Sequence, residues 1–273
     1  MEPGGLQMDK IGFIGVGNMG LPMLMGAVRV FGKESLLFNC VRAERKEFIN
    51  QKTGVDFVNN NKELAQSCKY IVLAVKPQFF HEVYADIKES ITKEHVLISA
   101  AAGITIAAMK EALGDSVRVV RSMPNTPALV GEGMTAVCYS RDEYTKVEKE
   151  LLHMFFQSFG KYEEFDESFI NAVICASGSS PAYVYMFIEA LADSAVKYGI
   201  PREKAYKLTA QAVMGAAKMV LETGEHPGKL KDQVCSPGGT TIAAVEALEE
   251  FGFRNAVMKA TDACYEKAVS LSK

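Results

Sequence analysis

The sequence predicts an α/β protein in which a doubly wound parallel sheet is followed by an all-α half. Short apolar runs alternate with longer stretches of helical periodicity over residues 1–165, and no convincing strand follows Phe165. Alternation of this kind is typical of parallel strands joined by right-handed helical crossovers. We therefore expect a dinucleotide-binding domain over residues 1–165 and a helical domain over residues 166–273.

Each expected element rests on a local pattern. Tyr70–Val75 is continuously apolar, as a strand buried on both faces of a parallel sheet should be. The other expected strands are Lys10–Gly15, Ser35–Cys40, Val55–Val58, His95–Ala100, Val117–Arg121, Thr135–Ser140 and Lys161–Phe165. The expected helices are Asn18–Phe31, Ala43–Lys52, Lys62–Ser67, Phe79–Glu89, Ile106–Leu113 and Asp142–Ser158, with a Pro/Gly-rich loop over Met123–Gly133. Breaks between the later helices are expected at Gly178–Pro181, Gly199–Pro201, Gly224–Gly228 and Pro237–Gly239.

The composition is that of an ordinary globular protein. Apolar residues make up 48% of the 273 residues and charged residues 23%, which excludes an intrinsically disordered or fibrous chain. The 30 Lys and Arg residues stand against 33 Asp and Glu residues, for a net charge of −3. A nucleic-acid-binding protein needs a dense positive surface, so no nucleic-acid partner is expected.

The spacing of cysteine and histidine predicts neither a metal site nor a disulfide framework. The six cysteines and four histidines are dispersed and no CxxC pair occurs, so no metal is expected. Dispersed cysteines are typical of reduced thiols in a cytoplasmic protein. The apolar segment Ile11–Val28 could be a signal peptide or a membrane span, but its five glycines argue against both interpretations. No membrane partner is expected.

A dinucleotide-binding fingerprint lies between the first strand and the first helix. Residues 15–20 read GVGNMG, which matches GxGxxG in the strand–turn–helix context that this motif requires. The first glycine permits the tight turn, the second lets the backbone approach a diphosphate, and the third lets the helix pack on the strand. The amide groups at the helix start then face the diphosphate. We therefore expect a Rossmann-type domain whose cofactor-binding residues include Gly15, Val16, Gly17, Asn18, Met19 and Gly20.

The end of the second strand favours NADPH as the cofactor. NAD-binding domains place Asp or Glu about 20 residues after the motif, where it accepts from the ribose 2′-hydroxyl. This sequence reads NCVR from Asn39 to Arg42, with no acid. Arg42 can pair with a 2′-phosphate and Asn39 can donate to it, although Arg42 could also be an exposed cation at a helix start. NADH stays the alternative cofactor.

Further segments fall at strand ends, where ligands bind in doubly wound sheets. Lys76 can lie beside the cofactor ribose and phosphate, and Pro77 starts the next helix. The turn Ala100–Gly103 has small side chains that leave room for a nicotinamide. Sterically easy turns explain these segments without a ligand as well. The additional cofactor-binding residues expected here are Asn61, Ala74, Val75, Lys76, Pro77 and Ala102.

Two features of the helical half bear on substrate and partners. The segment Ser236–Thr241 places two glycines and two hydroxyls at a helix start, which predicts a concave set of amides that binds a carboxylate; simple capping is the alternative. Ala256, Ala260, Cys264 and Ala268 recur every four residues and form one stripe of small side chains. The stripe can pack within an intramolecular bundle or against the helices of another subunit.

The sequence resembles the pyrroline-5-carboxylate reductase family over residues 12 to about 250. The segments that carry the resemblance are GFIGVGNMG, AVKPQ, SAAAGIT, RSMPNTPALVGEGMTA, SGSSPAYVYMFIEALAD, GIPREKAYKLTAQAVMGAAKM and HPGKLKDQVCSPGGTTIAAVEALE. The resemblance implies an oxidoreductase that reduces (S)-1-pyrroline-5-carboxylate to L-proline by hydride transfer from NADPH or NADH, the last step of proline biosynthesis. It also implies a homodimer of interleaved C-terminal helices, and a decamer is the larger ring expected.

The resemblance also assigns the substrate site. Thr241 matches the residue that hydrogen-bonds the ring nitrogen, and Gln233 lies near the nicotinamide. The backbone amides of the same loop are expected to hold the substrate carboxylate, because they open a helix. The substrate-binding residues are therefore expected to be Glu167, Gly239, Thr240 and Thr241, with Thr241 as the catalytic residue.

One departure and two rival functions bear on this assignment. The family usually reads SGSGP where this chain reads SGSSP, so the Ser180 side chain replaces a hydrogen near the site. A β-hydroxyacid dehydrogenase shares the two-domain plan, but it relies on a lysine early in the helix after the glycine turn, and here the first lysine is Lys197. A non-catalytic NADP-binding protein is the second rival.

Overall fold

The computed structural model describes residues 9–271 and divides into two compact units. The first unit comprises the described residues up to Gly178 together with residues 265–271, and the second comprises Ser179–Cys264. These units are defined by contacts between residues and not by function. They therefore do not test the domain boundary expected after Phe165, which stays a prediction. Residues 1–8 and 272–273 of the expected domains lie outside the described residues.

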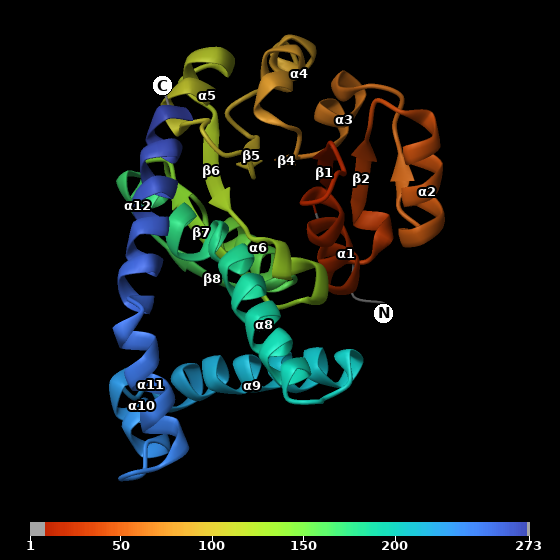
Figure 1. Cartoon of the computed structure of the whole chain (residues 1–273). Helices are drawn as coiled ribbons and strands as arrows, with labels where there is room; N and C mark the ends of the chain where they lie inside the picture. The colour runs from red at the N-terminus through yellow and green to blue at the C-terminus, as the bar shows by residue number, and fades with distance from the viewer. Residues whose placement is uncertain (1–8, 272–273) are drawn as a thin grey trace, which may run out of the picture. The chain divides into compact units, whose positions relative to one another are not determined.

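An eight-stranded sheet forms the centre of the first unit (Figure 1). Its strands lie in the order β3-β2-β1-β4-β5-β6-β7-β8. All neighbouring strands are parallel except β6 and β7. The strands are β1 (Ile11–Ile14), β2 (Leu36–Asn39), β3 (Asp56–Phe57), β4 (Tyr70–Leu73), β5 (Val96–Ser99), β6 (Arg118–Met123), β7 (Gly133–Tyr139) and β8 (Gly160–Glu164).

Helices cover both faces of this sheet, so it is doubly wound as predicted (Figure 1). One apolar core joins the sheet to α1 (Gly20–Phe31), α2 (Ala43–Thr53) and α6 (Lys146–Gln157). The other core joins it to α3 (Asn61–Ser67), α4 (Phe80–Ile87) and α5 (Ile106–Leu113). Short 3-10 turns lie at η1 (Lys33–Ser35), η2 (Pro77–Phe79), η3 (Thr126–Val130) and η4 (Glu167–Phe169).

The strands are apolar on both faces because each face has its own helices. Ile11 and Phe13 of β1 join the first core, whereas Ile14 joins the second. At Gly12 the second layer approaches the strand so closely that an added Cβ would lie 2.4 Å from Leu64. Continuous apolar runs in these strands therefore reflect burial on two sides.

The direction of β7 follows from the length of the connection before it. Residues 124–132 join β6 to β7 through η3, which is shorter than the dozen or more residues that a parallel crossover needs. β7 therefore runs antiparallel to β6, while α6 provides the crossover that makes β8 parallel to β7. The predicted fold class is confirmed, with this one antiparallel pair added.

No strand follows Glu164 in the described part of the chain, in agreement with the predicted helical half. Glycines with positive φ mark two of its helix boundaries: Gly224 caps α9 in the left-handed conformation, and Gly252 precedes α12 with φ +72°. The break at Gly252 was not predicted from the sequence. The later helices are α7 (Ile170–Val173), the π-helix η5 (Ile174–Gly178), α8 (Ser180–Lys197), α9 (Arg202–Thr223), α10 (Pro227–Val234), α11 (Thr240–Glu250) and α12 (Phe253–Leu271). Within residues 9–271 no helix is both long enough and apolar enough to cross a bilayer.

A buried carboxylate ties α6 to the strands beside it. The Glu148 side chain is 3% exposed and lies 2.6 Å from Arg118 Nη1 and 3.2 Å from Lys69 Nζ. Glu148 also accepts from the Thr145 amide at 2.8 Å, which completes a capping box at the start of α6. Burial alone would raise the pKa of Glu148, but the hydrogen bonds from Arg118, Thr145 and Lys69 lower it to about 2.

We predict that Glu148→Gln lowers the free energy of unfolding at pH 7 by about 3 kcal/mol, because Arg118 and Lys69 lose the negative charge with which they pair. Glu148 has a depressed pKa in the folded state. Its stabilisation is therefore complete above the ordinary pKa of 4.5 and is lost as the pH falls toward about 2. Urea unfolding at pH 7 and at pH 3 measures both effects. Glu150→Gln, which changes an exposed carboxylate of the same helix, is the control. Equal stability of the two variants at pH 7 would contradict the assignment.

Candidate active site

Five loops meet at the carboxyl edge of strands β1 to β5. β1 and β4 are neighbours in the sheet, yet the helices that follow them, α1 and α4, lie on opposite faces. Ligands of doubly wound sheets bind in the crevice that this reversal opens. The structure brings most of the expected cofactor residues to this edge: Gly15, Val16, Gly17, Asn18, Met19, Gly20, Asn39, Arg42, Asn61, Ala74, Val75, Lys76, Pro77 and Ala102.

The glycines of the fingerprint have three different environments. Gly15 has φ +83°, and an added Cβ would lie 2.5 Å from the Val75 side chain. A Cβ at Gly20 would lie 2.6 Å from the Gly15 carbonyl oxygen, so α1 packs directly on the turn. A Cβ at Gly17 would meet nothing within 4 Å. Only the second glycine therefore faces open space, as a glycine that admits a diphosphate should.

The start of α1 offers amides to a ligand. No side chain of the described residues caps this helix at Met19. The first hydrogen bond of the turn runs from the Leu21 amide to the Gly17 carbonyl at 3.0 Å. The amides before Leu21 lie at the positive end of the helix dipole, where an anion is stabilised. The backbone present at this site fits a dinucleotide diphosphate.

A second arginine, Arg45, lies near the end of β2 in addition to the predicted Arg42. Arg42 is exposed and stands at the N-cap of α2 without a side-chain capping bond. Arg45, one turn later, donates from Nε and Nη2 to the Val16 carbonyl at 3.2 and 3.1 Å and lies over the Phe48 ring. Burial raises the pKa of the Cys40 thiol, and its bond to the Val16 backbone and the charge of Arg45 oppose that rise. The i, i+3 spacing of Arg42 and Arg45 was the signal that could have found Arg45.

The Asn39 side chain is engaged within the protein. Its amide nitrogen donates to Asn61 Oδ1 at 2.7 Å, and the Asn61 nitrogen donates to Asp86 Oδ2 at 2.9 Å. Asn39 is 8% exposed. The expected donation from Asn39 to a phosphate therefore competes with a hydrogen bond already present.

The loops after β4 and β5 bring small residues to the same edge. The Ala74 amide donates to the Ile14 carbonyl at 2.9 Å, which extends the parallel pairing by one residue. Lys76 is exposed at the N-cap of η2, and Pro77 follows it at the first position of the turn. Ala102 precedes Gly103, which has φ +80°. These residues lie at the carboxyl edge of the sheet, and their contact with a cofactor stays a prediction.

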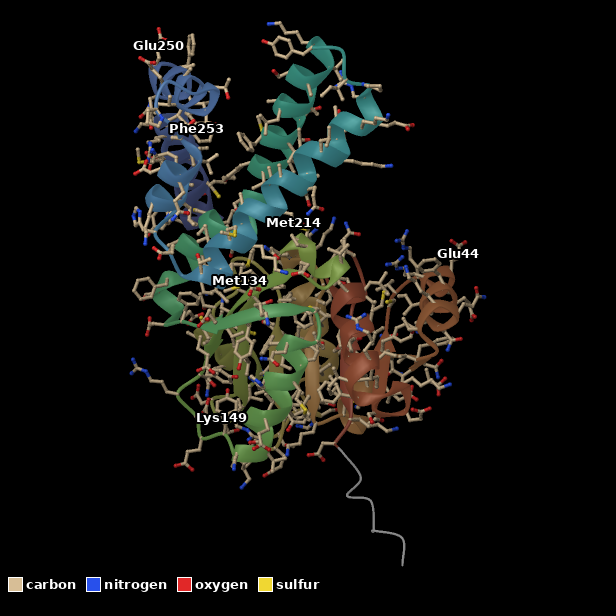
Figure 2. All side chains as sticks on the ribbon, turned by 90° about the horizontal axis from the view of Figure 1, so that it is seen from below. Glu44, Met134, Lys149, Met214, Glu250 and Phe253 are labelled. Atoms are coloured by element: carbon tan, nitrogen blue, oxygen red, sulfur yellow. The ribbon has the colours of Figure 1, made fainter. Side chains whose placement is uncertain are left out.

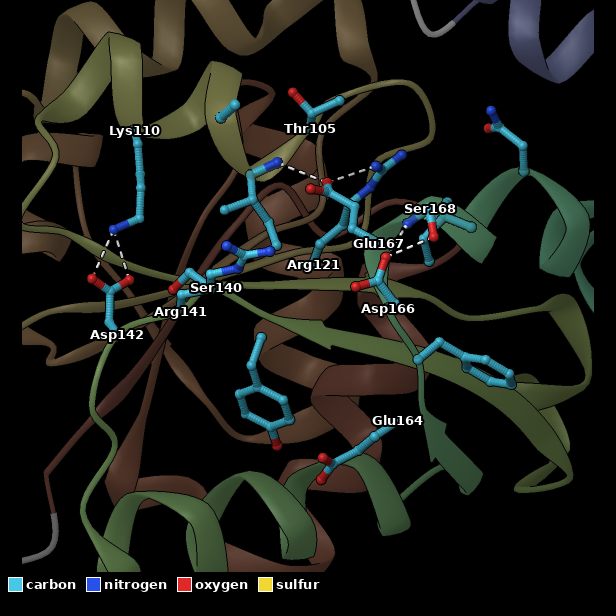
Figure 3. A pocket seen from close by; sticks show the side chains of 16 residues that line it. Thr105, Lys110, Arg121, Ser140, Arg141, Asp142, Glu164, Asp166, Glu167 and Ser168 are labelled. Atoms are coloured by element: carbon cyan, nitrogen blue, oxygen red, sulfur yellow. Dashed lines mark hydrogen bonds and ion pairs between the residues drawn. The ribbon is translucent and has the colours of Figure 1, made fainter.

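Glu167 lies elsewhere in the first unit, in a cavity of about 990 Å³ between α5 and the strands β6 and β7. One oxygen of Glu167 accepts from Arg121 Nη1 at 2.8 Å and from the Ile106 amide at 2.9 Å (Figure 3). Arg121 is 4% exposed, so this carboxylate neutralises a buried cation. Glu167 therefore pairs with Arg121 and accepts from the first amide of α5, and its contact with substrate stays a prediction.

The same cavity holds two further carboxylates with local partners (Figure 3). Lys110 lies 2.6 Å from Asp142, and this partner and Ser140 lower the pKa of Asp142 although burial opposes the change. Hydrogen bonds from Ser168 lower the pKa of Asp166. Neighbouring groups therefore hold Asp142 and Asp166 in their charged form.

The expected carboxylate-binding loop lies in the helical unit. Gly238 has φ +68°, and the Gly239 amide donates to the Ser236 carbonyl at 3.0 Å, so a tight turn leads into α11. Thr240 and Thr241 form the first turn of α11, and no described side chain caps it. The exposed Gln233 stands on α10, the preceding helix. The local geometry is that of an open helix start, as the predicted amide site requires.

Comparison with known proteins identifies the family. Pyrroline-5-carboxylate reductase from Escherichia coli (strain K12) is 47% identical over 267 residues, which cover 97% of this chain and 98% of the relative. The chain belongs to the pyrroline-5-carboxylate reductase family. Residues 167–271 match a family model described as pyrroline-5-carboxylate reductase dimerisation. Residues 10–103 match a model described as NADP oxidoreductase, coenzyme F420-dependent.

Solved pyrroline-5-carboxylate reductases share this fold over their whole length. The enzyme from Plasmodium falciparum, solved with NADP bound, has a TM-score of 0.87 and 34% identity, and covers 98% of this chain and 100% of its own. The enzyme from Coxiella burnetii has a TM-score of 0.89 and 34% identity, and covers 97% of this chain and 99% of its own. The family predicted from the sequence motifs is confirmed.

Asn125 joins the loop after β6 to the start of β7 and to the π-helix. Asn125, in the loop after β6, is buried and accepts from the Met134 amide at 2.9 Å. It also donates to the Ser177 carbonyl at 3.0 Å, inside the π-helix that ends at Gly178. The Pro/Gly-rich loop at Met123–Gly133 was predicted from the sequence, but the π-helix was not, since no periodicity marks a single wide turn.

We predict that Gly17→Ala leaves the melting temperature within about 2 °C of the wild type, because the added methyl group meets open space. The dissociation constant for NADPH should rise about tenfold, or roughly 1.4 kcal/mol, because that space admits the diphosphate. Thermal unfolding and fluorescence titration measure the two quantities. Gly15→Ala is the comparison: it forces a side chain into a positive φ and into Val75, and should lower the melting temperature. Unchanged affinity in Gly17→Ala would refute the position assigned to the diphosphate.

Proposed function

We propose that this protein reduces (S)-1-pyrroline-5-carboxylate to L-proline, with NADPH as the preferred hydride donor and NADH as the alternative. The observation that carries the proposal is identity of 47% with a pyrroline-5-carboxylate reductase over 97% of the chain. The glycine turn supports the proposal independently. No side chain of the described residues caps the amides at the start of α1, and Gly17 faces open space. The reaction is the last step of proline biosynthesis.

The chain's own residues bind and orient the cofactor. When bound, NADPH supplies the hydride that reduces the carbon–nitrogen double bond. The amides of residues 15–20 hold the diphosphate. Arg42, helped by Arg45, faces the 2′-phosphate. The residues proposed to line the rest of the cofactor are Asn39, Asn61, Ala74, Val75, Lys76, Pro77, Ala102 and Gln233.

The substrate is held by the helix start at Thr240. Backbone amides of residues 239–241 bind its carboxylate, and the Thr241 hydroxyl orients the ring nitrogen. Glu167 is proposed to contact the substrate, with Arg121 fixing the orientation of its carboxylate. Positioning carries most of the rate, since a protonated imine accepts hydride without a strong acid–base pair.

We infer a homodimer, assembled further into a decamer. The match of residues 167–271 to a dimerisation domain supports the dimer. Large apolar side chains of the helical unit are exposed in the single chain, among them Met214 and Phe253 (Figure 2). Ala256 and Ala260 of the small stripe are exposed as well. Faces of this kind are typical of obligate interfaces. The dispersed spacing of the six cysteines supports a cytoplasmic location.

The direct test follows the loss of NADPH absorbance on addition of pyrroline-5-carboxylate, with L-proline identified as the product. A β-hydroxyacid as substrate in place of the imine would show the first rival function. Binding of NADPH without turnover of either substrate would show a non-catalytic protein.

We predict that Arg42→Asp erodes the preference for NADPH over NADH in kcat/KM by about 10–150-fold, because one charge-assisted phosphate contact is lost. Steady-state kinetics with both cofactors measure the preference. Lys52→Asp makes the same change of charge in the last turn of α2 and should leave the preference close to the wild type. A wild type that uses NADH better than NADPH would contradict this assignment.

We predict that Thr241→Ala lowers kcat/KM for pyrroline-5-carboxylate by about 10–100-fold, or roughly 1.4–2.7 kcal/mol, because the ring nitrogen loses its polar neighbour. The melting temperature and the affinity for NADPH should change little. Thr241→Ser keeps the hydroxyl and should retain most of the activity. Equal kinetics of the alanine and serine variants would show that the Thr241 hydroxyl does not act on the substrate.

We predict that Ala260→Glu gives an inactive or aggregating protein, because it places a bulky charge in the stripe of small residues at the inferred interface. Asp262→Arg changes an exposed position on the other side of α12 and is the control. Light scattering, sedimentation and activity on dilution report the outcome. A fully active monomer at micromolar concentration would rule out the requirement for a dimer.

A further inference from the structure

Three polar side chains form a hydrogen-bonded chain at the edge where β2 ends. Asn39 is the last residue of β2, Asn61 opens α3, and Asp86 lies on α4. The Asn39 nitrogen donates to Asn61 Oδ1 at 2.7 Å, and the Asn61 nitrogen donates to Asp86 Oδ2 at 2.9 Å. We call this set the Asn39–Asn61–Asp86 relay. It joins three separate elements of the first unit.

The carboxylate sets the direction of every bond in the relay. A carboxylate accepts hydrogen bonds and does not donate them, whereas an amide side chain does both from opposite ends. Asp86 therefore draws the nitrogen of Asn61 toward itself, which turns the Asn61 oxygen toward Asn39. The reverse arrangement would set two oxygens against each other. Asn39 must then present its nitrogen to Asn61, and its oxygen lies at the other end of the amide group.

That oxygen lacks a partner in the described part of the chain. Asn39 Oδ1 is buried and accepts no hydrogen bond from residues 9–271. A buried acceptor without a donor is unfavourable and uncommon. Asn39 also stands 19 residues after Gly20, close to the position where NAD-binding domains use an acid to accept from a ribose hydroxyl. The unpaired acceptor thus occurs at a position suited to a hydroxyl donor.

We propose that Asp86 is a positioning residue that acts through Asn61 to hold Asn39 as an acceptor for a ribose hydroxyl of the dinucleotide. The inference rests on the dinucleotide-dependent function proposed above and deepens it. In NADH the donor is the 2′- or 3′-hydroxyl, and in NADPH it is the 3′-hydroxyl. A neutral amide accepts from a hydroxyl without repelling a neighbouring phosphate as a carboxylate would.

Recognition of the cofactor is therefore divided between the two arginines and Asn39. Arg42 and Arg45 favour the cofactor that carries a 2′-phosphate, whereas Asn39 has two ribose hydroxyls to accept from in NADH and only the 3′-hydroxyl in NADPH. The choice between NADPH and NADH depends in part on Asp86, which contacts neither the phosphate nor the ribose itself.

Asp86→Asn tests the relay, because an amide at position 86 can accept from Asn61 or donate to it. The relay can then invert and turn the Asn39 nitrogen outward. We expect kcat/KM with NADH to fall about three- to tenfold, the effect of one neutral hydrogen bond, and kcat/KM with NADPH to fall less or to rise. The ratio of the two values is the readout, since general damage to the fold would lower both.

The chain offers a matched control next to the relay. Lys62 Nζ and Glu89 Oε2 form an exposed ion pair at 3.3 Å, each adjacent or close in sequence to a member of the relay. Glu89→Gln removes a carboxylate from the same region without touching Asn61, and should leave the cofactor ratio unchanged. Asp86→Glu keeps an acceptor-only group and should restore most of the wild-type ratio.

A double-mutant cycle separates the relay from an indirect effect. With Asn39→Ala in place there is no amide to orient, so Asp86→Asn should no longer change the ratio. A wild-type ratio in both Asp86→Asn and Asp86→Ala, each of them active, would overturn the proposal, because alanine leaves Asn61 without this acceptor. So would the same change of ratio in the Asn39→Ala background.

Measurements of cofactor binding test the relay independently of the proposed reaction. Titration with NADPH and with NADH gives the ratio of dissociation constants even where pyrroline-5-carboxylate is not turned over. Absence of turnover would count against the reductase activity, and an unchanged binding ratio would count against the relay. If Asp86→Asn does not fold, Asp86→Ala also removes the acceptor from Asn61 and takes its place in both measurements.

Discussion

The close approach of the β1–α1 turn to the loop after β4 is the constraint on which the site depends. A side chain at Gly15 would run into Val75, and a side chain at Gly20 would run into the turn itself. Because neither exists, α1 starts directly at the edge of the sheet and its first amides face the crevice. The parallel order of β2, β1, β4 and β5 then brings the other loops to the same edge.

The two edges of the sheet differ in how their charged side chains are paired. At the opposite edge, Glu148 is buried with Arg118 and Lys69, so these charges neutralise one another and stabilise the start of α6. At the carboxyl edge, Arg42 is exposed and Arg45 bonds a carbonyl of the glycine turn, so positive charge is available where a phosphate is expected. The Asn39–Asn61–Asp86 relay adds a neutral acceptor beside these cations.

Much of the fold could be read from the sequence because its signals are local. Apolar runs such as Tyr70–Leu73 and glycine-ended helices such as α2 follow from burial on two faces and from left-handed caps. The fingerprint at residues 15–20 was recognisable because all of its constraints lie within one turn. The antiparallel direction of β7 was harder to foresee, since it follows from the length of a loop that also contains a 3-10 turn.

What sequence reasoning missed depends on contacts between distant residues. Nothing in the local pattern at Arg45 indicates that it will bond Val16, 29 positions earlier. The engagement of Glu167 with Arg121 and the direction of the relay at Asp86 likewise require the sheet order and the helix packing. Motif matching located loops that lie together at the carboxyl edge of the sheet, but it could not tell which polar atoms are already hydrogen-bonded within the protein.

Hydrogen–deuterium exchange with and without NADPH tests most directly whether the five loops form one dinucleotide site. We predict slower exchange at residues 16–21, with smaller decreases at residues 40–46, 59–61, 75–76 and 101–103, and no change at residues 145–150 on the opposite edge of the sheet. Exchange that stays the same at residues 16–21 while NADPH is bound would contradict the account, because the diphosphate would then lie elsewhere.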